Sequence, residues 1–291
     1  MSKKKAYLKY FAGLLLFGSN GVVASFISLS SYEIVLLRSL FGGVLLLILF
    51  LITRQKFTAF HNKKDLLFIM LSGAAMAADW LFLFEAYARI GVSLGMLINY
   101  SGPAIVMVLS PFVFKERLTG RKMLSFLAAL IGVCLIGGAG VSGGINLTGL
   151  ICAILSAFSY AAMVICNKKS VHVTGIENSL VQLLTTFFAV AIFVGIKQGF
   201  AIKIAPNEWP AILWLGLINT GLGCYFYFSS IGALPAQTVA VCGYLEPLSA
   251  VVMAALILHE TMMPVQYIGA VMIIGGALLG ECTLKRKKIK A

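Results

Sequence analysis

Long apolar runs, separated by short polar segments, follow one another along almost the whole chain. An α-helix needs about 20 residues to cross a hydrocarbon core of roughly 30 Å, because it rises about 1.5 Å per residue. The runs do not alternate polar and apolar residues, so helices rather than barrel strands are predicted. Ten spans are predicted, at residues 7–28, 32–53, 65–86, 92–114, 122–140, 147–166, 175–197, 209–231, 236–258 and 264–282. The pattern therefore predicts an all-α polytopic membrane protein.

The same pattern of spans is written twice. Tyr100-Ser-Gly-Pro103 returns as Tyr244-Leu-Glu-Pro247, and the same offset relates Glu116 to Glu260. This duplication predicts two related halves of five helices each, at residues 1–142 and 143–291. Because five is an odd number, the second half enters the membrane the opposite way up. The ten transmembrane helices are therefore expected to form two inverted five-helix repeats, which can open a central site first to one side and then to the other.

The charge distribution indicates how the chain lies in the membrane. The composition is 60% hydrophobic and 11% charged, and the net charge is +13. Most basic residues lie at the ends of spans and in the segments that are cytoplasmic if the N-terminus is inside, which places both termini in the cytoplasm. The basic excess then reflects topology and attraction to anionic lipid, and no nucleic acid partner is expected. We predict a multi-pass protein of the bacterial cytoplasmic membrane.

The sequence contains no recognisable secretion signal, metal or catalytic motif. The basic N-terminus is followed by a run long enough to span and by no A-x-A site, so the first span is expected to remain in the mature protein. The six cysteines show no disulfide or metal spacing, and His259-Glu-Thr-Met-Met263 lacks the second histidine of a zinc motif. Asp65 and Asp79 are the only aspartates, and Asp65 lies at a loop, which excludes an aspartic dyad. We expect no enzyme activity, no cofactor and no metal.

The third span carries two acids in apolar surroundings. Asp79 and Glu85 are six residues apart and so lie on different faces of a helix. Asp79 lies nearer the middle of the bilayer, where acids are costly and usually functional. Glu85 is either a second such group or the partner of Arg89 in a helical salt bridge. Trp80 is a candidate to line a binding site, although aromatic residues at helical spacing also serve as packing.

The fourth and ninth spans contain the repeated proline. Pro103 and Pro247 each remove a backbone hydrogen bond in mid-membrane, so both helices are expected to bend and to face each other. The residues around these bends are candidate substrate contacts: Asn99, Tyr100, Tyr244 and Glu246. Glu246 is the third deep acid, and it or Asp79 is a candidate proton-coupling group.

Other polar residues within spans have two interpretations each. Each of these residues either faces a polar cavity or forms a hydrogen bond with a neighbouring helix. They are Asn20 in the first span, Tyr160 in the sixth and Tyr225 in the eighth. Arg38 in the second span forms a structural ion pair or contacts an anionic substrate. We favour the ion pair, with Glu33 or with a carboxylate of the third span.

Several motifs together resemble a known family. Phe17-Gly-Ser-Asn20, the arginine in the second span, and Glu116-Arg-Leu-Thr119 before Gly132 are similar to the EamA family of the drug/metabolite transporter superfamily. The resemblance implies cytoplasmic termini, alternating access and a central cavity lined by helices 1, 3, 4, 6, 8 and 9. Family members mostly export amino acids and other small metabolites. The chain departs from the family pattern in carrying both Asp79 and Glu246 near the midplane.

These observations favour a secondary active transporter that moves a small polar metabolite, an amino acid or an amine, by alternating access, as an exporter or with linked protons. The alternative is an importer or facilitator of an organic cation such as a quaternary amine, held by the acids and the aromatic residues. A small-molecule substrate, the lipid bilayer and protons are the expected partners, and the protein is expected to be a monomer or a homodimer.

Overall fold

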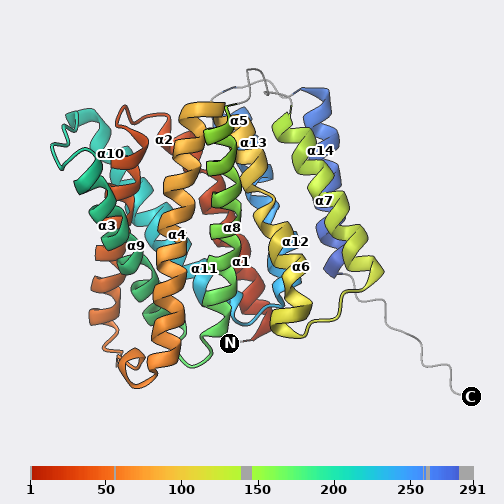
Figure 1. Ribbon diagram of the computed structural model, residues 1–291, viewed down its shortest axis with the longest axis horizontal. Coiled ribbons are helices and arrows are strands. Elements are labelled where there is room, and N and C mark those ends of the chain that lie inside the picture. Colours follow the sequence, from red (N-terminus) through yellow and green to blue (C-terminus); the bar gives the residue numbers. More distant parts are fainter. Residues whose placement is uncertain (1, 56, 139–145, 258, 260–262, 282–291) are drawn as a thin grey trace, which may run out of the picture.

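The computed structural model describes residues 2–55, 57–138, 146–257, 259 and 263–281, and these residues form helices and connecting loops without any strand (Figure 1). Each predicted range coincides with one or more helices. The first half contains α1 (Lys3–Gly18), α2 (Asn20–Ala24), α3 (Ser31–Ile52), η1 (Ala59–His61), α4 (Lys63–Ile90), α5 (Val92–Asn99), α6 (Gly102–Phe114) and α7 (Gly120–Gly138). The second half contains α8 (Leu147–Lys169), α9 (Gly175–Lys197), η2 (Pro206–Glu208), α10 (Trp209–Leu213), η3 (Trp214–Leu222), α11 (Gly223–Ile231), α12 (Ala236–Gly243), α13 (Leu245–Ile257) and α14 (Pro264–Glu281).

Many of these helices are suited to a membrane. Seven helical segments of the described chain are long and apolar enough to cross a bilayer by length and composition. Large apolar side chains such as Phe112 and Leu256 point outward and are exposed, as expected where lipid replaces water. The all-helical polytopic fold is thus borne out, while the count of ten crossings and the inverted repeat stay predictions.

The two proline helices are broken where the sequence predicts. α5 ends at Asn99 and α6 begins at Gly102, with Pro103 in its first turn. α12 ends at Gly243 and α13 begins at Leu245, with Pro247 close behind. The Tyr244 hydroxyl donates a hydrogen bond to the Tyr100 carbonyl oxygen over 3.0 Å, so the two breaks face each other as expected.

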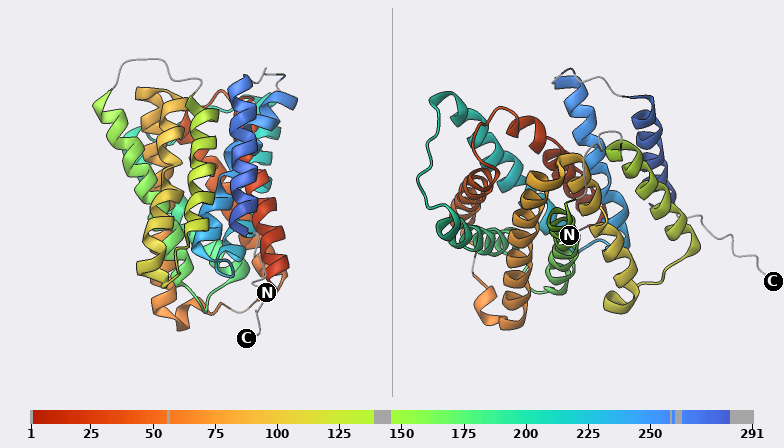
Figure 2. Two further views of the ribbon diagram at one scale, coloured as in Figure 1. Left: turned by 90° about the vertical axis from the view of Figure 1, so that its right-hand side faces the viewer. Right: turned by 45° about the horizontal axis from the view of Figure 1, so that its top comes forward.

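Close helix contacts depend on glycines at the interfaces. α7 and α14 run side by side at one edge of the bundle (Figures 1 and 2). A Cβ atom on Gly132 of α7 would lie 2.6 Å from the Gly269 carbonyl oxygen of α14, and one on Gly276 would lie 2.7 Å from the Ser125 carbonyl oxygen. Small residues therefore let these backbones touch, which is the usual way in which helices pack within membranes.

One end of the bundle is closed by hydrogen bonds between helices. We call the end at which α1 begins the closed end and the opposite end, at which α3 and α14 begin, the open end (Figure 1). At the closed end the Glu116 carboxylate accepts hydrogen bonds from the backbone nitrogens of Ala236 and Gln237, at 2.6 and 3.1 Å. The Tyr10 hydroxyl donates to the Val239 carbonyl oxygen over 2.7 Å. The Lys168 ammonium group donates to the Ile231 carbonyl oxygen over 2.8 Å. These bonds tie the end of α11 and the start of α12 to α1, to α8 and to the segment that follows α6.

Candidate functional site

A cavity of about 970 Å³ lies between the helices. Its wall extends from the middle of the bundle to residues at the open end, such as Ser31 and Gln266. Most of the wall is apolar or aromatic. The charged or amide side chains of its deeper part are Asn20, Arg38, Asp79 and Glu246, which come from four different helices. A mostly apolar cavity with a few converging polar groups is typical of a small-molecule site.

Asp79 is held by a hydrogen-bond network behind the wall. Its side chain is only 5% exposed, and its Oδ1 accepts a hydrogen bond from Asn99 Nδ2 over 2.8 Å. The same amide nitrogen donates to Ser156 Oγ over 2.9 Å, so Asn99 connects α4, α5 and α8. Asn99 itself is not part of the wall. The amide therefore fixes the direction in which the Asp79 carboxyl group points.

Glu246 lies in the first turn of α13, directly after the break at Tyr244. A helix N-terminus favours a negative charge because its unpaired backbone N–H groups point toward it. α1 approaches closely here, since a Cβ atom on Gly18 would lie 3.0 Å from the Glu246 carbonyl oxygen. Within the described chain neither Glu246 nor Asp79 forms an ion pair, so both acids face the cavity without a fixed cation.

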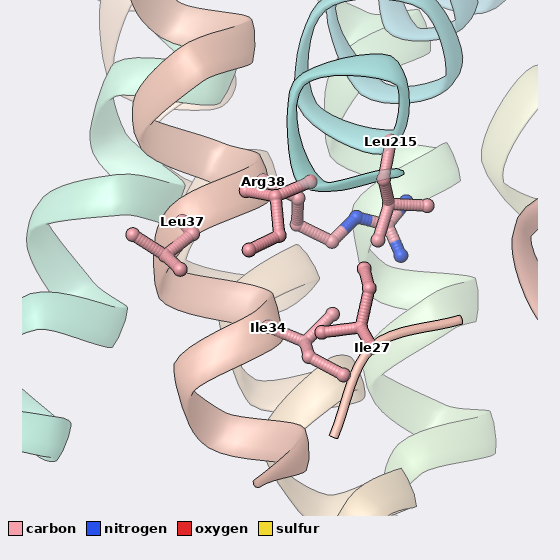
Figure 3. A pocket seen from close by; sticks show the side chains of 6 residues that line it. Ile27, Ile34, Leu37, Arg38 and Leu215 are labelled. Carbon is pink, nitrogen blue, oxygen red and sulfur yellow. The ribbon is translucent and has the colours of Figure 1, made fainter. Parts of the chain in front are cut away.

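Arg38 is the cationic group of the wall, and the expected ion pair is not observed. Glu33 instead forms a capping box with Ser30 at the start of α3, and no carboxylate in the described residues pairs with Arg38. The guanidinium group donates through Nε to Thr220 Oγ1 over 2.9 Å and lies 4.5 Å from the centre of the Trp80 ring. Figure 3 shows the side chain reaching from α3 toward Leu215.

Glu85 has a structural role. Its carboxylate pairs with Arg89 over 2.6 Å and with Lys197 over 2.9 Å, and it also accepts a hydrogen bond from the Tyr32 hydroxyl. The helical salt bridge is thus confirmed. Three aromatic residues of the same helix belong to the cavity wall: Trp80, Phe84 and Tyr87.

The structure brings five of the nine predicted substrate contacts to the cavity wall: Asn20, Asp79, Trp80, Tyr100 and Glu246. Their role in binding substrate stays a prediction.

The other predicted contacts lie behind or away from the wall. Asn99 supports Asp79, and Tyr244 is fully buried against Tyr100. The Tyr160 hydroxyl lies 3.3 Å from the hydroxyl of Tyr227, which does line the cavity. The Tyr225 hydroxyl accepts a hydrogen bond from the Lys9 ammonium group over 3.0 Å.

A feature that the sequence analysis missed is the π-helical segment η3, where backbone hydrogen bonds join residues five positions apart instead of four. η3 carries Thr220, the partner of Arg38, and Thr220 Oγ1 donates in turn to the Leu215 carbonyl oxygen over 2.8 Å. In the sequence, the available signal for this segment was the pair of glycines at 216 and 221. Both contact α3 so closely that a side chain would not fit.

A bundle of apolar helices around a cavity with buried charged groups is typical of membrane transport proteins. The model of the EamA-like transporter family matches residues 4–138 and again residues 147–280. The chain belongs to this family, which is part of the drug/metabolite transporter superfamily.

Relatives with curated descriptions are also named as transporters. The chain is 27% identical to the "Uncharacterized transporter YxxF" of Bacillus subtilis (strain 168), over 99% of this chain and 92% of that protein. It is 29% identical to a "Probable amino-acid metabolite efflux pump" of Salmonella typhimurium, over 67% of this chain and 69% of the relative. A pump of the same description from Escherichia coli (strain K12) is 26% identical over 73% of this chain and 76% of the relative.

The fold is shared with a protein of known crystal structure. The two superpose with a TM-score of 0.82 at 18% sequence identity, over 96% of this chain and 99% of the other. At this identity the likeness concerns the fold alone.

Proposed function

We propose that this transporter is a secondary active carrier that moves a small polar metabolite, an amino acid or an amine, across the cytoplasmic membrane by alternating access. The observation that carries the proposal is a cavity of about 970 Å³ whose wall, within the described residues, reaches the open end and contains two acids that form no ion pair there. The hydrogen bonds of Glu116, Tyr10 and Lys168 close the other end. A cavity accessible from one side at a time is what a carrier requires and what a channel lacks.

In this proposal the halves at residues 1–142 and 143–291 are inverted repeats. Inverted repeats can pack in two alternative ways, one for each state of the carrier. Corresponding positions support it. α5 begins after Gly91 at the open end, and α12 begins after Pro235 at the closed end. The breaks at Tyr100 and Tyr244 correspond in the same way. Rocking of one half against the other would then exchange the open and the closed end.

The orientation in the membrane follows from charge in this proposal. The described basic segments at residues 3–9, 63–64, 115–122 and 168–169 lie at the closed end, which we assign to the cytoplasm together with both termini (Figure 1). The structure then corresponds to an outward-facing state. Export is the direction supported by the relatives described as efflux pumps of amino-acid metabolites.

Asp79 and Glu246 are the proposed proton-coupling groups. Both are unpaired acids of the cavity wall, where bound substrate and protons would compete or cooperate for the same space. Because neither acid forms an ion pair within the described residues, a change in its charge changes the electrostatic environment of the substrate directly.

The test is counterflow of radiolabelled amino acids and amines in proteoliposomes, measured across a range of pH. Saturable counterflow is expected for the wild type, and Asp79→Asn or Glu246→Gln is expected to alter its pH dependence. Glu85→Gln is the matched control, because Glu85 lies in an ion-pair cluster outside the wall. Non-saturable flux without counterflow would contradict a carrier, and wild-type pH profiles in both acid variants would remove the proton-coupling role.

A carrier for an organic cation is the second candidate. Trp80, Tyr87 and Tyr100 line the cavity together with the two acids, and aromatic faces with nearby carboxylates attract ammonium groups. In the same experiment, counterflow of quaternary amines in the absence of amino-acid counterflow would favour this candidate.

A further inference from the structure

Arg38 is a buried cation that forms no ion pair with any described residue. Its side chain is 8% exposed, and the one hydrogen bond that it donates in the described structure is the bond from Nε to Thr220. Nη1 and Nη2 have no acceptor there, and neither is among the fully enclosed polar atoms that lack a partner. They therefore reach the cavity space. A buried charge without a close partner is unfavourable, and no carboxylate of the described residues lies within ion-pair distance of Arg38, so its terminal nitrogens are available to the anionic group of a ligand.

The guanidinium group is fixed in place before any ligand arrives. It stacks over the Trp80 ring at 4.5 Å on one side, and Thr220 fixes Nε on the other. Thr220 is itself anchored in the π-helical segment, which packs tightly on α3: a Cβ atom on Gly42 would lie 3.1 Å from the Gly216 carbonyl oxygen. This positioning leaves the two terminal nitrogens as a planar fork, which matches the two oxygens of a carboxylate.

The surroundings of the fork are apolar. Ile27, Ile34 and Leu215 line a small hollow next to Arg38, and Figure 3 shows Ile27 beside the guanidinium group. Side chains of this kind offer no competing acceptor, and an apolar neighbourhood strengthens a charge-assisted hydrogen bond.

The acids of the wall provide the opposite charge. Trp80, on which Arg38 stacks, directly follows Asp79 in α4, and Glu246 attracts the Arg38 charge across the same cavity. A purely cationic ligand would leave Arg38 unpaired, and a purely anionic one would meet two carboxyl groups. A ligand with both an ammonium and a carboxylate group can satisfy both parts of the wall.

We propose that Arg38 binds the carboxylate of a zwitterionic amino acid through Nη1 and Nη2, while Asp79 or Glu246 receives its ammonium group. This inference rests on the proposed function and names the substrate class of the same cavity. It excludes simple amines as the main substrate, because they lack the group that Arg38 requires.

The test compares ligands on the wild-type protein before any substitution is made. The free amino acids are added one by one to the detergent-purified transporter, each beside its amide and its decarboxylated amine, and thermal stability is measured. At least one amino acid is expected to stabilise the protein, with its amide and amine bound at least about tenfold more weakly, because each lacks the charged acceptor. Equal stabilisation by an amino acid and its amide would overturn the proposal.

Variants of Arg38 test the residue itself. Arg38→Gln is expected to weaken amino-acid binding at least about tenfold, and Arg38→Lys to restore part of it, because lysine keeps the charge and loses the fork. Arg89→Gln is the matched control, since it removes an arginine outside the wall, and its affinity is expected to equal that of the wild type. Unchanged affinity in Arg38→Gln would overturn the assignment.

Counterflow in proteoliposomes separates this inference from the proposed function. Amino-acid counterflow that persists unchanged in Arg38→Gln would keep the carrier and remove the role of Arg38. If neither amino acids nor amines show counterflow with the wild type, the proposed function fails and the inference fails with it.

Discussion

Two carboxyl groups of α4 have different surroundings although both lie in one apolar helix. Glu85 pairs with Arg89 four residues later, a contact that helix geometry alone predicts. Its further partners, Tyr32 and Lys197, belong to other helices, and their positions depend on packing that spacing does not reveal. Asp79 accepts a hydrogen bond from Asn99, which lies twenty residues later in another helix. For the same reason, the sequence could name both residues but could not show their contact.

The ion pair predicted for Arg38 was wrong for a physical reason. The prediction rested on the rule that buried charges are paired within the protein. The nearest acid in sequence, Glu33, lies in the first turn of α3 and is already bonded to Ser30, where it satisfies backbone donors at the helix start. Asp79 of α4 and Glu246 of α13 lie in the cavity wall. The sequence alone does not show where these acids lie relative to Arg38.

Asn99 is expected to be a supporting residue for Asp79. In Asn99→Ala, the Asp79 carboxyl group loses its donor in a site only 5% exposed. Leaving a buried polar group unsatisfied costs about 1–3 kcal/mol, so the free energy of unfolding in detergent should fall by this amount. Asn62→Ala, which removes an amide from an exposed bond of 3.3 Å, should change stability by less than about 0.5 kcal/mol. Equal effects of the two variants would contradict the supporting role.

At the scale of elements, local chemistry predicted where helices break but not where a helix changes to π-helical hydrogen bonding. Pro103 and Pro247 predicted breaks that the structure has, because a missing backbone donor acts locally. The π-helical segment η3 has no such local cause. It forms where Gly216 and Gly221 let α3 approach the backbone, and so it depends on a neighbouring helix that the sequence does not position.

Two adjacent glycines of α14 test the role of close backbone contact. A Cβ atom on Gly276 would lie 2.7 Å from the Ser125 carbonyl oxygen and 3.0 Å from the Ala129 backbone nitrogen, whereas one on Gly275 would meet nothing within 4 Å. Gly276→Ala should therefore lower the free energy of unfolding by about 1–3 kcal/mol, because α7 and α14 must separate. Gly275→Ala should raise it by up to about 1 kcal/mol, because alanine loses less backbone entropy. Equilibrium unfolding of both variants in one detergent checks the sign, and a loss of equal size in both would contradict the contact.

At the scale of the whole molecule, the closed end depends on few bonds between helices. The Glu116 carboxylate occupies the N-terminus of α12, where it accepts from Ala236 and Gln237. The offset that relates Glu116 to Glu260 was visible in the sequence, but the bond partner of Glu116 was not, because it lies 120 residues away. Glu260 lies outside the described residues.

Removing the Glu116 carboxylate should shift the carrier toward the state that is open at this end. In Glu116→Ala the first backbone donors of α12 lose a charged acceptor, and one such bond contributes about 1.5–3 kcal/mol. A change of about 1.4 kcal/mol is a factor of ten in the population of the inward-open state. A buried reporter cysteine at position 240 should therefore react at least about tenfold faster in Glu116→Ala than in the protein with Glu116, when an impermeant maleimide is added from the cytoplasmic side. Ala240 is 1% exposed in the structure and lies in α12, so the reporter is shielded until this end opens.

A control is needed because Glu116→Ala also lowers stability, and a less stable protein could react faster by partial unfolding. Glu33→Ala removes a carboxylate that caps only its own helix at the open end, through its bonds with Ser30. Its loss costs about 0.5–2 kcal/mol of helix capping without releasing a contact between helices, so labelling at position 240 should stay at the wild-type rate. Faster labelling in both variants would point to unfolding. Faster labelling in Glu116→Ala alone would show that the Glu116 carboxylate holds the closed end shut. A saturating ligand that favours the outward-facing state should then reverse the faster labelling, since a ligand shifts a conformational equilibrium only through its differential affinity for the two states.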